Sequence, residues 1–373
     1  MDRADSRKRF WQLAFFPIVV YALVEGLRWG HLVDYNVYAV RYGFVDSWFT
    51  NVEHSSPMFT IIVYALKSIG VPYSMFIVLQ CGFLMFSGIF LLQDYKTYAK
   101  WILPCFLIAF SANENFIRFF LGLSFFFIAL YYLTKGNTVK YVLFSIVGCL
   151  IHFGVIPLIV FFMFSRILNK RSFPPIISCI VFVVSTFAIS ISDLHIIVSV
   201  TDFLLKPFSN ADYQFVTYAN SMDRVIMGEG GAKLGVKTAQ LSNQIKNLLT
   251  YVPVILLAPK WINRYEWGNF VYNVMIINII ISPIFTQVEL MGRFTQALGI
   301  FCALGVAVTF SNYTKKTLIV ENKCYLILFL SLFCYFYGFI NSPFVRQDYE
   351  MYFIWDSNGA ITNWAPYHRG AAW

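Results

Sequence analysis

The chain has little charge for its size. Only 13% of its 373 residues are Asp, Glu, Lys or Arg, whereas soluble domains carry about 25%. Hydrophobic residues make up 58% of the sequence, 19% of the residues are aromatic, and the mean hydropathy is +0.64. This composition excludes an ordinary soluble enzyme. It predicts an all-α, polytopic integral membrane protein with a single transmembrane domain over residues 1–373.

The sequence also lacks the short motifs that mark many catalytic centres. It has no glycine-rich phosphate loop, no nucleophile elbow and no zinc-type His/Cys spacing. Its seven cysteines all lie in or at the ends of apolar runs, which favours packing roles over disulfides or metal binding. We therefore expect no metal and no cofactor. The net charge of +9 is attributed to a positive-inside bias, so no nucleic acid partner is expected.

A cleavage site and internal repeats are missing as well. The basic segment MDRADSRKRF precedes an apolar run, as in a signal peptide. No small-residue cleavage site follows, so residues 10–27 are expected to remain as a first helix. No repeat of fixed period is visible, which disfavours a transporter built from repeats.

The apolar runs predict the membrane-spanning segments. They cover residues 10–27, 73–93, 101–113, 117–134, 139–166, 174–191, 246–260, 268–286, 294–311 and 324–341. Two regions are ambiguous. Residues 57–69 are short for a spanning helix of about 20 residues. Residues 139–166 are long enough for one tilted helix or for two short helices that turn at His152-Phe153-Gly154.

Basic clusters decide between these arrangements. They flank the apolar runs at the N-terminus and at Lys96/Lys100, Lys135/Lys140, Arg166/Lys170/Arg171, Lys260/Arg264 and Lys315/Lys316/Lys323. All of them lie in the cytoplasm if 57–69 only dips into the outer leaflet and 139–166 crosses twice. That arrangement is preferred to one in which 57–69 spans and 139–166 crosses once.

The preferred arrangement has about 11 transmembrane helices, short and re-entrant segments included, and a cytoplasmic N-terminus. Its external parts include a first loop (28–72) with a re-entrant or interfacial helix, a large loop (192–245) and a C-terminal tail (342–373). The turns that contain Arg118, His152 and Arg293 also face outwards.

Charged residues near the predicted outer surface are the candidates for a functional site. A charge at helix-centre depth costs about 2.5–3.5 kcal/mol, so such residues are functional candidates by default. Arg118 follows Glu114, and Arg293 follows Glu289, both in the favourable i,i+4 order. One interpretation is a pair of intrahelical ion pairs. The other is that each glutamate orients a guanidinium that binds phosphate oxygens.

His152 and the first loop add further candidates. His152 lies in the apolar stretch IVGCLIHFGVIP, where it either packs with a hydrogen bond or offers a donor or a proton to a leaving phosphate. The first loop contains Asp34, Arg41 and Glu53 among many aromatic residues. One of its carboxylates can act as general base for a sugar hydroxyl. Alternatively, these are solvated loop charges beside interfacial aromatic residues.

The stretch from NENFIRFFLG to PLIVFFMF, residues 113–164, resembles the central block of the EpsG/Wzy group of bacterial polysaccharide polymerases. In that block an Asn-x-Ile-Arg turn leads into an apolar helix that ends in basic residues, and a His breaks the next apolar run. Asn115, Ile117, Arg118 and His152 fill those positions. The chain departs from the group at Phe119, where Gln is usual, and after His152, where Ser or Thr tends to follow but Phe153-Gly154 stand here.

The resemblance extends beyond this block. Asp34, Tyr38, Glu53, Pro57 and Phe59 resemble the group's first external loop, and Arg293 matches a late external Arg. The close resemblance covers roughly residues 30–165, and the rest of the chain resembles the group only in topology.

The resemblance implies a glycosyltransferase at the periplasmic face of the bacterial inner membrane. Such an enzyme moves a growing glycan from undecaprenyl diphosphate onto the terminal hydroxyl of an incoming lipid-linked repeat unit. The implied partners are this lipid-linked oligosaccharide, the bilayer and a chain-length regulator protein.

The implied roles fall on named residues. Arg118, Arg293, Asn115 and Arg41 bind the diphosphate, and Glu114 and Glu289 orient the arginines. His152 and either Asp34 or Glu53 are the catalytic candidates.

Three other functions remain as alternatives at this stage. A flippase for the same lipid-linked oligosaccharide would have pseudo-symmetric halves and a cationic central cavity, without large external loops. A ligase that joins the glycan to the lipid A core would share the leaving-group chemistry. A structural scaffold would not require the charged residues near the predicted outer surface.

Overall fold

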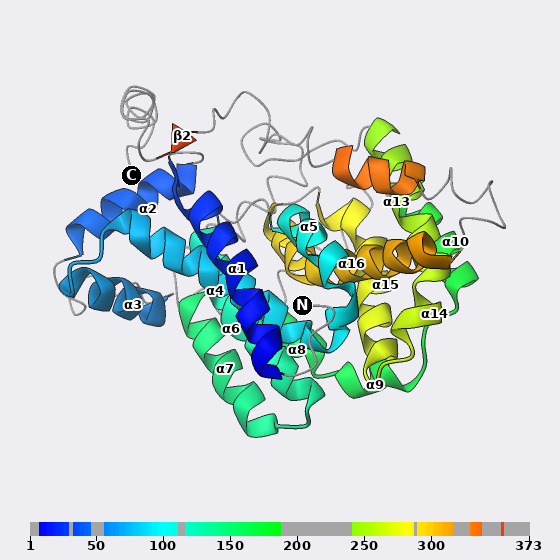
Figure 1. The fold of residues 1–373 in the computed structure, drawn as a ribbon, viewed down its shortest axis with the longest axis horizontal. Coiled ribbons are helices and arrows are strands. Elements are labelled where there is room, and N and C mark those ends of the chain that lie inside the picture. Colours follow the sequence, from blue (N-terminus) through cyan, green and yellow to red (C-terminus); the bar gives the residue numbers. More distant parts are fainter. Residues whose placement is uncertain are drawn as a thin grey trace, which may run out of the picture. The chain divides into compact units, whose positions relative to one another are not determined.

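The computed structural model describes residues 7–29, 33–45, 56–110, 116–187, 241–286, 289–316, 329–337 and 352–353. Within these ranges the protein is helical apart from one two-stranded ladder, in agreement with the predicted all-α class (Figure 1). The chain divides into two compact units, Met1–Val160 with Phe339–Trp373, and Phe161–Gly338. Residues 192–240 of the predicted 192–245 loop and most of the tail at 342–373 lie outside the described residues.

The first unit is a set of packed helices in which α4 contacts both α1 and α6, and α6 pairs with α7 (Figure 1). Its helical elements are α1 (Arg7–Gly26), α2 (Val33–Phe44), α3 (Pro57–Ser68), α4 (Tyr73–Leu91), η1 (Gln93–Tyr98), α5 (Ala99–Ala109), α6 (Ile117–Thr134), α7 (Thr138–Ile151), η2 (Phe153–Val155) and α8 (Ile156–Phe162), which ends in the second unit.

Aromatic contacts fix the directions of the central helices. Trp11, near the start of α1, lies 6.0 Å from Phe90, near the end of α4, measured between ring centroids. The two helices are therefore antiparallel. Phe83 and Phe90 lie 4.8 and 4.4 Å from Phe125 and Tyr131 of α6, in matching order. Helices α4 and α6 therefore run parallel and begin at the same end of the unit.

Helices α6 and α7 form a tight antiparallel hairpin. The turn between them contains Gly136 at φ +69°, a conformation that glycine adopts without strain. Asn137 caps α7, because its Oδ1 accepts the Lys140 backbone N–H at 3.1 Å. Farther along, a Cβ on Gly122 or Gly148 would lie 2.9 Å from the other residue's carbonyl oxygen. Only glycine permits this approach, which brings the end of α7 against the beginning of α6.

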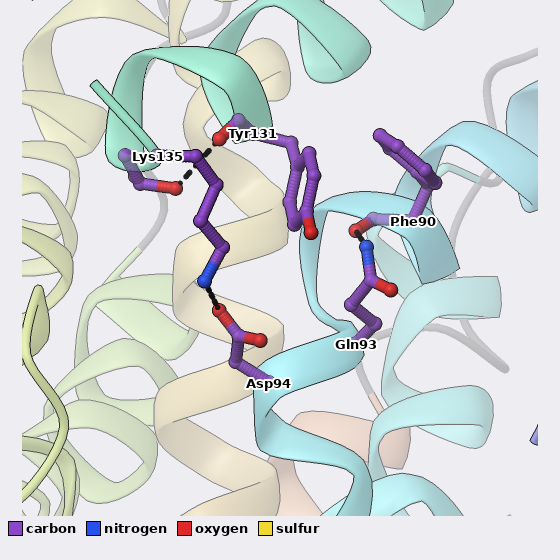
Figure 2. Close-up of polar contacts among 6 residues, drawn as sticks. Phe90, Gln93, Asp94, Tyr131 and Lys135 are labelled. Carbon is purple, nitrogen blue, oxygen red and sulfur yellow. Dashed lines mark hydrogen bonds and ion pairs between the residues drawn. The ribbon is translucent and has the colours of Figure 1, made fainter. Parts of the chain in front are cut away.

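A basic cluster lies at the turn end of this hairpin. Lys135 Nζ donates to Asp94 Oδ2 at 2.8 Å and so joins the turn to η1 (Figure 2). Lys140 Nζ lies 4.7 Å from the centroid of the Tyr132 ring. Arg118 lies at the other end of α6, about 25 Å away at 1.5 Å per residue. The basic groups near Asp94 and the start of α6 therefore occupy opposite ends of the unit.

Helix α2 packs by a row of tyrosines on one face. Tyr35, Tyr38 and Tyr42 are buried at i, i+3 and i+7, the spacing of a helix face. The Tyr42 hydroxyl donates to the Val71 carbonyl at 2.6 Å, and burial raises the pKa of this tyrosine. The Tyr73 hydroxyl donates to the Tyr35 carbonyl at 2.8 Å. These bonds hold α2 against the beginning of α4, at the Arg118 end of the unit.

Helix α3 lies beside α2 at this end. Its 12 residues extend about 18 Å, less than the hydrocarbon core of about 30 Å. The Phe59 ring lies 5.6 Å from the ring of Tyr38, and Lys67 Nζ donates to the Gly43 carbonyl at 2.7 Å. Both the first and the last turn of α3 thus contact α2. The predicted partial insertion of this segment into the membrane stays a prediction.

A short ladder joins the first loop to the tail. Strand β1 (Arg28–Trp29) pairs antiparallel with β2 (Tyr352–Phe353), with Arg28 opposite Phe353 and Trp29 opposite Tyr352. The segment that follows α1 and the C-terminal tail therefore meet within the first unit.

The second unit is built around the antiparallel pair α15 and α16, in which Phe285 lies 6.2 Å from Phe294 between ring centroids. Its described helices are α9 (Ser165–Lys170), α10 (Pro175–Phe187), α13 (Leu241–Leu257), α14 (Pro259–Ile262), α15 (Gly268–Phe285) and α16 (Glu289–Lys316), with a further helical stretch over 329–337. Helix α13 begins inside the predicted 192–245 loop.

The buried side-chain amide of Asn273 joins α15 to the end of α9 and the residues that follow it. Asn273 Nδ2 donates to the carbonyls of Leu168 and Arg171 at 2.6 and 2.8 Å, and its Oδ1 accepts the Phe173 N–H at 2.8 Å. Asn169 Nδ2 also donates to the Glu266 carbonyl at 3.3 Å. The basic clusters near Lys170 and Arg264 therefore lie at one end of this unit, and Arg293 lies at the far end of the α15–α16 hairpin.

Among the described residues, four helices are long and apolar enough to cross a membrane, at Tyr73–Leu91, Ile117–Thr134, Gly268–Phe285 and Met291–Asn312. They fall on the predicted spans 73–93, 117–134, 268–286 and 294–311. Residues 139–166 are not one helix, because α7 ends at Ile151 and η2 and α8 follow. The protein is thus a helical membrane protein, and the number of about 11 spans stays a prediction.

Candidate functional site

Arg118 occupies the first turn of α6, where three residues of the first loop surround its guanidinium. Its Nε donates to the Tyr38 hydroxyl, and its Nη1 donates to Ser56 Oγ at 3.3 Å. Its Cζ lies 5.2 Å from the Tyr38 ring centroid and 5.9 Å from that of Phe59. Such cation–π contacts contribute about 0.5–2 kcal/mol each, depending on exposure. The guanidinium therefore contacts two aromatic rings, those of Tyr38 and Phe59, and two hydroxyl groups, those of Tyr38 and Ser56.

A second arginine approaches the same ring. The Cζ of Arg41 lies 6.0 Å from the Tyr38 centroid, one turn farther along α2. Arg41 is exposed, whereas Arg118 is half-buried. Two guanidinium groups from distant parts of the sequence thus converge on Tyr38. Both groups are cationic, so an anion bound beside Tyr38 would interact favourably with each of them.

Ser56 has an unusual role for its position. It is the N-cap of α3, with Pro57 at the first helical position, a common way to begin a helix. Its hydroxyl nevertheless makes no capping hydrogen bond, and it accepts from Arg118 instead. Only 2% of Ser56 is exposed. This buried hydroxyl therefore contacts the arginine and does not cap its own helix.

His152 ends α7 at the same end of the α6–α7 hairpin. Its backbone is extended, at φ −155° and ψ 119°, and its Nδ1 accepts the Gly154 N–H at 2.9 Å. A neutral His152 therefore carries its proton on Nε2, because an Nδ1 that accepts a hydrogen bond cannot bear one. The side chain can offer an N–H donor at Nε2.

The two departures from the EpsG/Wzy pattern surround this histidine. The buried Phe119 ring lies 5.5 Å from the imidazole centroid in an edge-to-face arrangement. A Cβ on Gly154 would lie 2.7 Å from His152 Nδ1 and 3.4 Å from Phe119 Cδ2. The Phe119 ring therefore packs against the imidazole ring of His152, and Gly154 leaves room for it because glycine has no side chain. Arg118 and Phe119 are consecutive on a helix, about 100° apart, so arginine and histidine lie on adjacent faces of one helix end.

The remaining candidates are placed less completely. Asp34 lies in α2 one turn before Tyr38, and Glu289 begins α16, but only their backbones are described. Arg293 is half-buried in the first turns of α16, in the second unit. Glu53, Glu114 and Asn115 lie outside the described residues. The predicted Glu–Arg ion pairs therefore stay predictions.

No group of three or more potential metal ligands occurs among the described residues. Six cysteines in this part of the chain are free thiols, and Cys324 lies outside it.

The sequence predicted roles for Arg118, Arg41 and His152, which stay predictions, but gave none to Ser56 or to the rings of Tyr38 and Phe59. Ser56-Pro57 is recognisable as a helix start. That its hydroxyl would instead contact a residue 62 positions away has no local signal.

These features define a helical integral membrane protein in which cationic and aromatic side chains gather at one end of the first unit. The chain belongs to the EpsG family, whose profile matches residues 11–354, and which includes Wzy-like polysaccharide polymerases. No curated protein and no solved structure matches the chain at a significant level.

Proposed function

We propose that the protein is a polysaccharide polymerase that transfers a growing glycan from undecaprenyl diphosphate to the terminal hydroxyl of an incoming lipid-linked repeat unit. The reaction breaks the bond between the anomeric carbon and the diphosphate oxygen. It forms a new bond from that carbon to the acceptor oxygen, and the acceptor hydroxyl gives up its proton. Undecaprenyl diphosphate is the leaving group, and the reaction takes place at the periplasmic face of the inner membrane.

The convergence of Arg118 and Arg41 on Tyr38 is the observation that carries this proposal. A diphosphate leaving group gains negative charge as the glycosidic bond breaks, and preorganised cations stabilise that charge most effectively. Arginine also matches phosphate oxygens with two parallel donors. Arg118 lies at the beginning of α6, which is long and apolar enough to span a membrane, and this location suits a headgroup carried by a lipid.

His152 and a first-loop carboxylate complete the proposed chemistry. An Nε2–H on His152 donates to a diphosphate oxygen or to the sugar, and Asp34 or Glu53 accepts the proton of the attacking hydroxyl. Arg293 is proposed as a further diphosphate ligand, on the basis of the sequence alone.

The surface polysaccharide of a deletion strain tests the function. A polymerase is expected to leave a band of single repeat units on a gel, because units are still made, exported and attached. Complete loss of surface glycan would contradict the proposal and favour a flippase or a ligase. Complementation with wild-type protein should restore the long chains, and the Arg41→Ala variant should restore fewer of them.

A further inference from the structure

We infer that Tyr38 and Ser56 are positioning residues that hold the Arg118 guanidinium in the orientation needed to bind a diphosphate. This inference rests on the proposed function. It assigns to the two hydroxyl groups a role that acts through Arg118 and not by contact with the substrate.

Both hydroxyl groups belong to buried residues, so packing contacts other than those with Arg118 help to fix their positions. Tyr38 is 8% exposed and Ser56 is 2% exposed, and the Tyr38 ring packs edge-on against Phe59. Tyr38 is held by helix α2, whereas Ser56 is held by the start of α3. The guanidinium is therefore bound at two points whose positions are set by different helices.

The type of acceptor matters as much as its position. A hydroxyl accepts a hydrogen bond from a guanidinium without cancelling its charge, whereas a carboxylate forms an ion pair that an incoming phosphate must displace. Because Nε donates to Tyr38, the arginine meets a phosphate through its Nη groups. Tyr38 and Ser56 thus orient the fork without neutralising its charge.

The uncapped α3 start supports the same conclusion. A serine at an N-cap normally accepts a backbone N–H of its own helix, but Ser56 does not. Replacement of Ser56 by Ala therefore removes an Arg118 contact without removing a helix cap. The effect of this substitution on function is separable from its effect on folding.

Tyr42 provides a matched control for Tyr38. Both are buried tyrosines on the same face of α2. The Tyr38 hydroxyl accepts a hydrogen bond from Arg118, whereas the Tyr42 hydroxyl donates to the Val71 carbonyl. Tyr38→Phe and Tyr42→Phe each remove one hydroxyl and keep the ring. Only the first changes a contact of the arginine.

The experiment compares steady-state polymerisation by purified full-length variants with lipid-linked repeat units. Tyr38→Phe and Ser56→Ala are expected to lower kcat/KM by about tenfold to a hundredfold, the usual effect of losing a hydrogen bond to a charged group. Tyr42→Phe should stay within about twofold, since its hydroxyl bonds to neutral backbone. Equal losses in Tyr38→Phe and Tyr42→Phe would overturn the inference.

Each substitution is also made in an Arg118→Lys background. A residue that acts through the guanidinium should lose its effect there, so Tyr38→Phe is expected to change the residual rate by less than about twofold. A packing role predicts the same fold-loss in both backgrounds, and that result would contradict the inference.

A binding measurement separates this inference from the proposed function. Farnesyl diphosphate, titrated into the protein in nanodiscs, should bind more weakly to Tyr38→Phe than to wild type or Tyr42→Phe. If wild-type protein binds the probe in this Tyr38-dependent way but makes no polymer, the positioning role stands and the polymerase proposal fails. If wild type makes polymer and Tyr38→Phe equals it in both assays, the positioning role fails alone.

Discussion

The Arg118 guanidinium lies over the Tyr38 ring, 5.2 Å from its centroid, and its Nε donates to the hydroxyl of the same tyrosine. A residue of the first loop thereby contacts the beginning of a membrane-spanning helix 80 positions later in the chain. Because Arg41 approaches the same ring, Tyr38 connects the two cations that we propose bind the diphosphate.

His152 gives a prediction that separates a role in the site from a role in packing. The amide of Gln at 152 can place a donor near the former Nε2, whereas the side-chain oxygen of Asn can replace Nδ1 and accept the Gly154 N–H. We expect His152→Gln to retain more turnover than His152→Asn, and His152→Asn to retain the higher thermal stability. Purified variants provide both measurements.

A purely structural His152 would give the opposite order of turnover, with Asn near wild type and Gln impaired. If both variants are stably folded and both lose about a hundredfold or more in rate, the histidine transfers a proton as well as donating a hydrogen bond.

The Gly122–Gly148 crossing predicts a local sensitivity to a single methyl group. Gly122→Ala places a Cβ 2.9 Å from the Gly148 carbonyl oxygen, a backbone atom that cannot rotate away. We expect a loss of about 1–3 kcal/mol in stability. Thermal unfolding in detergent measures this loss. The control is Gly43→Ala, an exposed helical glycine where a Cβ meets nothing within 4 Å, which should be neutral or stabilising.

The arrangement of the first unit predicts opposite accessibility for two exposed hydroxyl residues, Ser68 and Thr138. Ser68 ends α3 at the Arg118 end, and Thr138 begins α7 at the Lys135 end. In a cysteine-free variant we expect Ser68→Cys to react with an impermeant maleimide in intact spheroplasts and Thr138→Cys to react only after lysis. Labelling of both from the same side would contradict a membrane crossing by α4 and α6.

The sequence allowed the helical class and the main spans to be predicted because burial in lipid demands long apolar runs. The limits of α6 were predicted at residues 117–134, as found, since Asn115 and Lys135 bracket a stretch that is apolar apart from Arg118 and a few small or hydroxyl residues. For residues 139–166 the sequence left two alternatives, one tilted helix or two short helices that turn near His152. The structure has the break, with Gly148 and Gly154 on either side of it. Their packing against α6 and against the imidazole ring is a tertiary effect without a local pattern.

The candidate site was predictable in part for a similar reason. Arg118, Arg41 and His152 are polar residues in apolar or aromatic surroundings, and such residues are detectable one at a time. The approach of Arg41 and Arg118 to Tyr38 depends on how α2 packs on the beginning of α4, through Tyr42 and Tyr73. The place of His152 depends on the close contact between α6 and α7. Long-range contacts of this kind leave no trace in spacing or composition, so Ser56 and Phe59 could not be assigned.

Arg118 itself provides the most direct test of the central claim, that its guanidinium binds the diphosphate during glycan transfer. The measurement is the polymerisation rate of Arg118→Lys and Arg118→Ala, normalised to folded protein, with Glu114→Gln for comparison. Lysine supplies the charge but not the planar fork. We expect Arg118→Ala to lose about a hundredfold to a thousandfold in rate, the usual effect of removing one preorganised donor. Arg118→Lys should lose most of its activity, and Glu114→Gln should lose less. Turnover near the wild-type rate in folded Arg118→Ala would contradict the account.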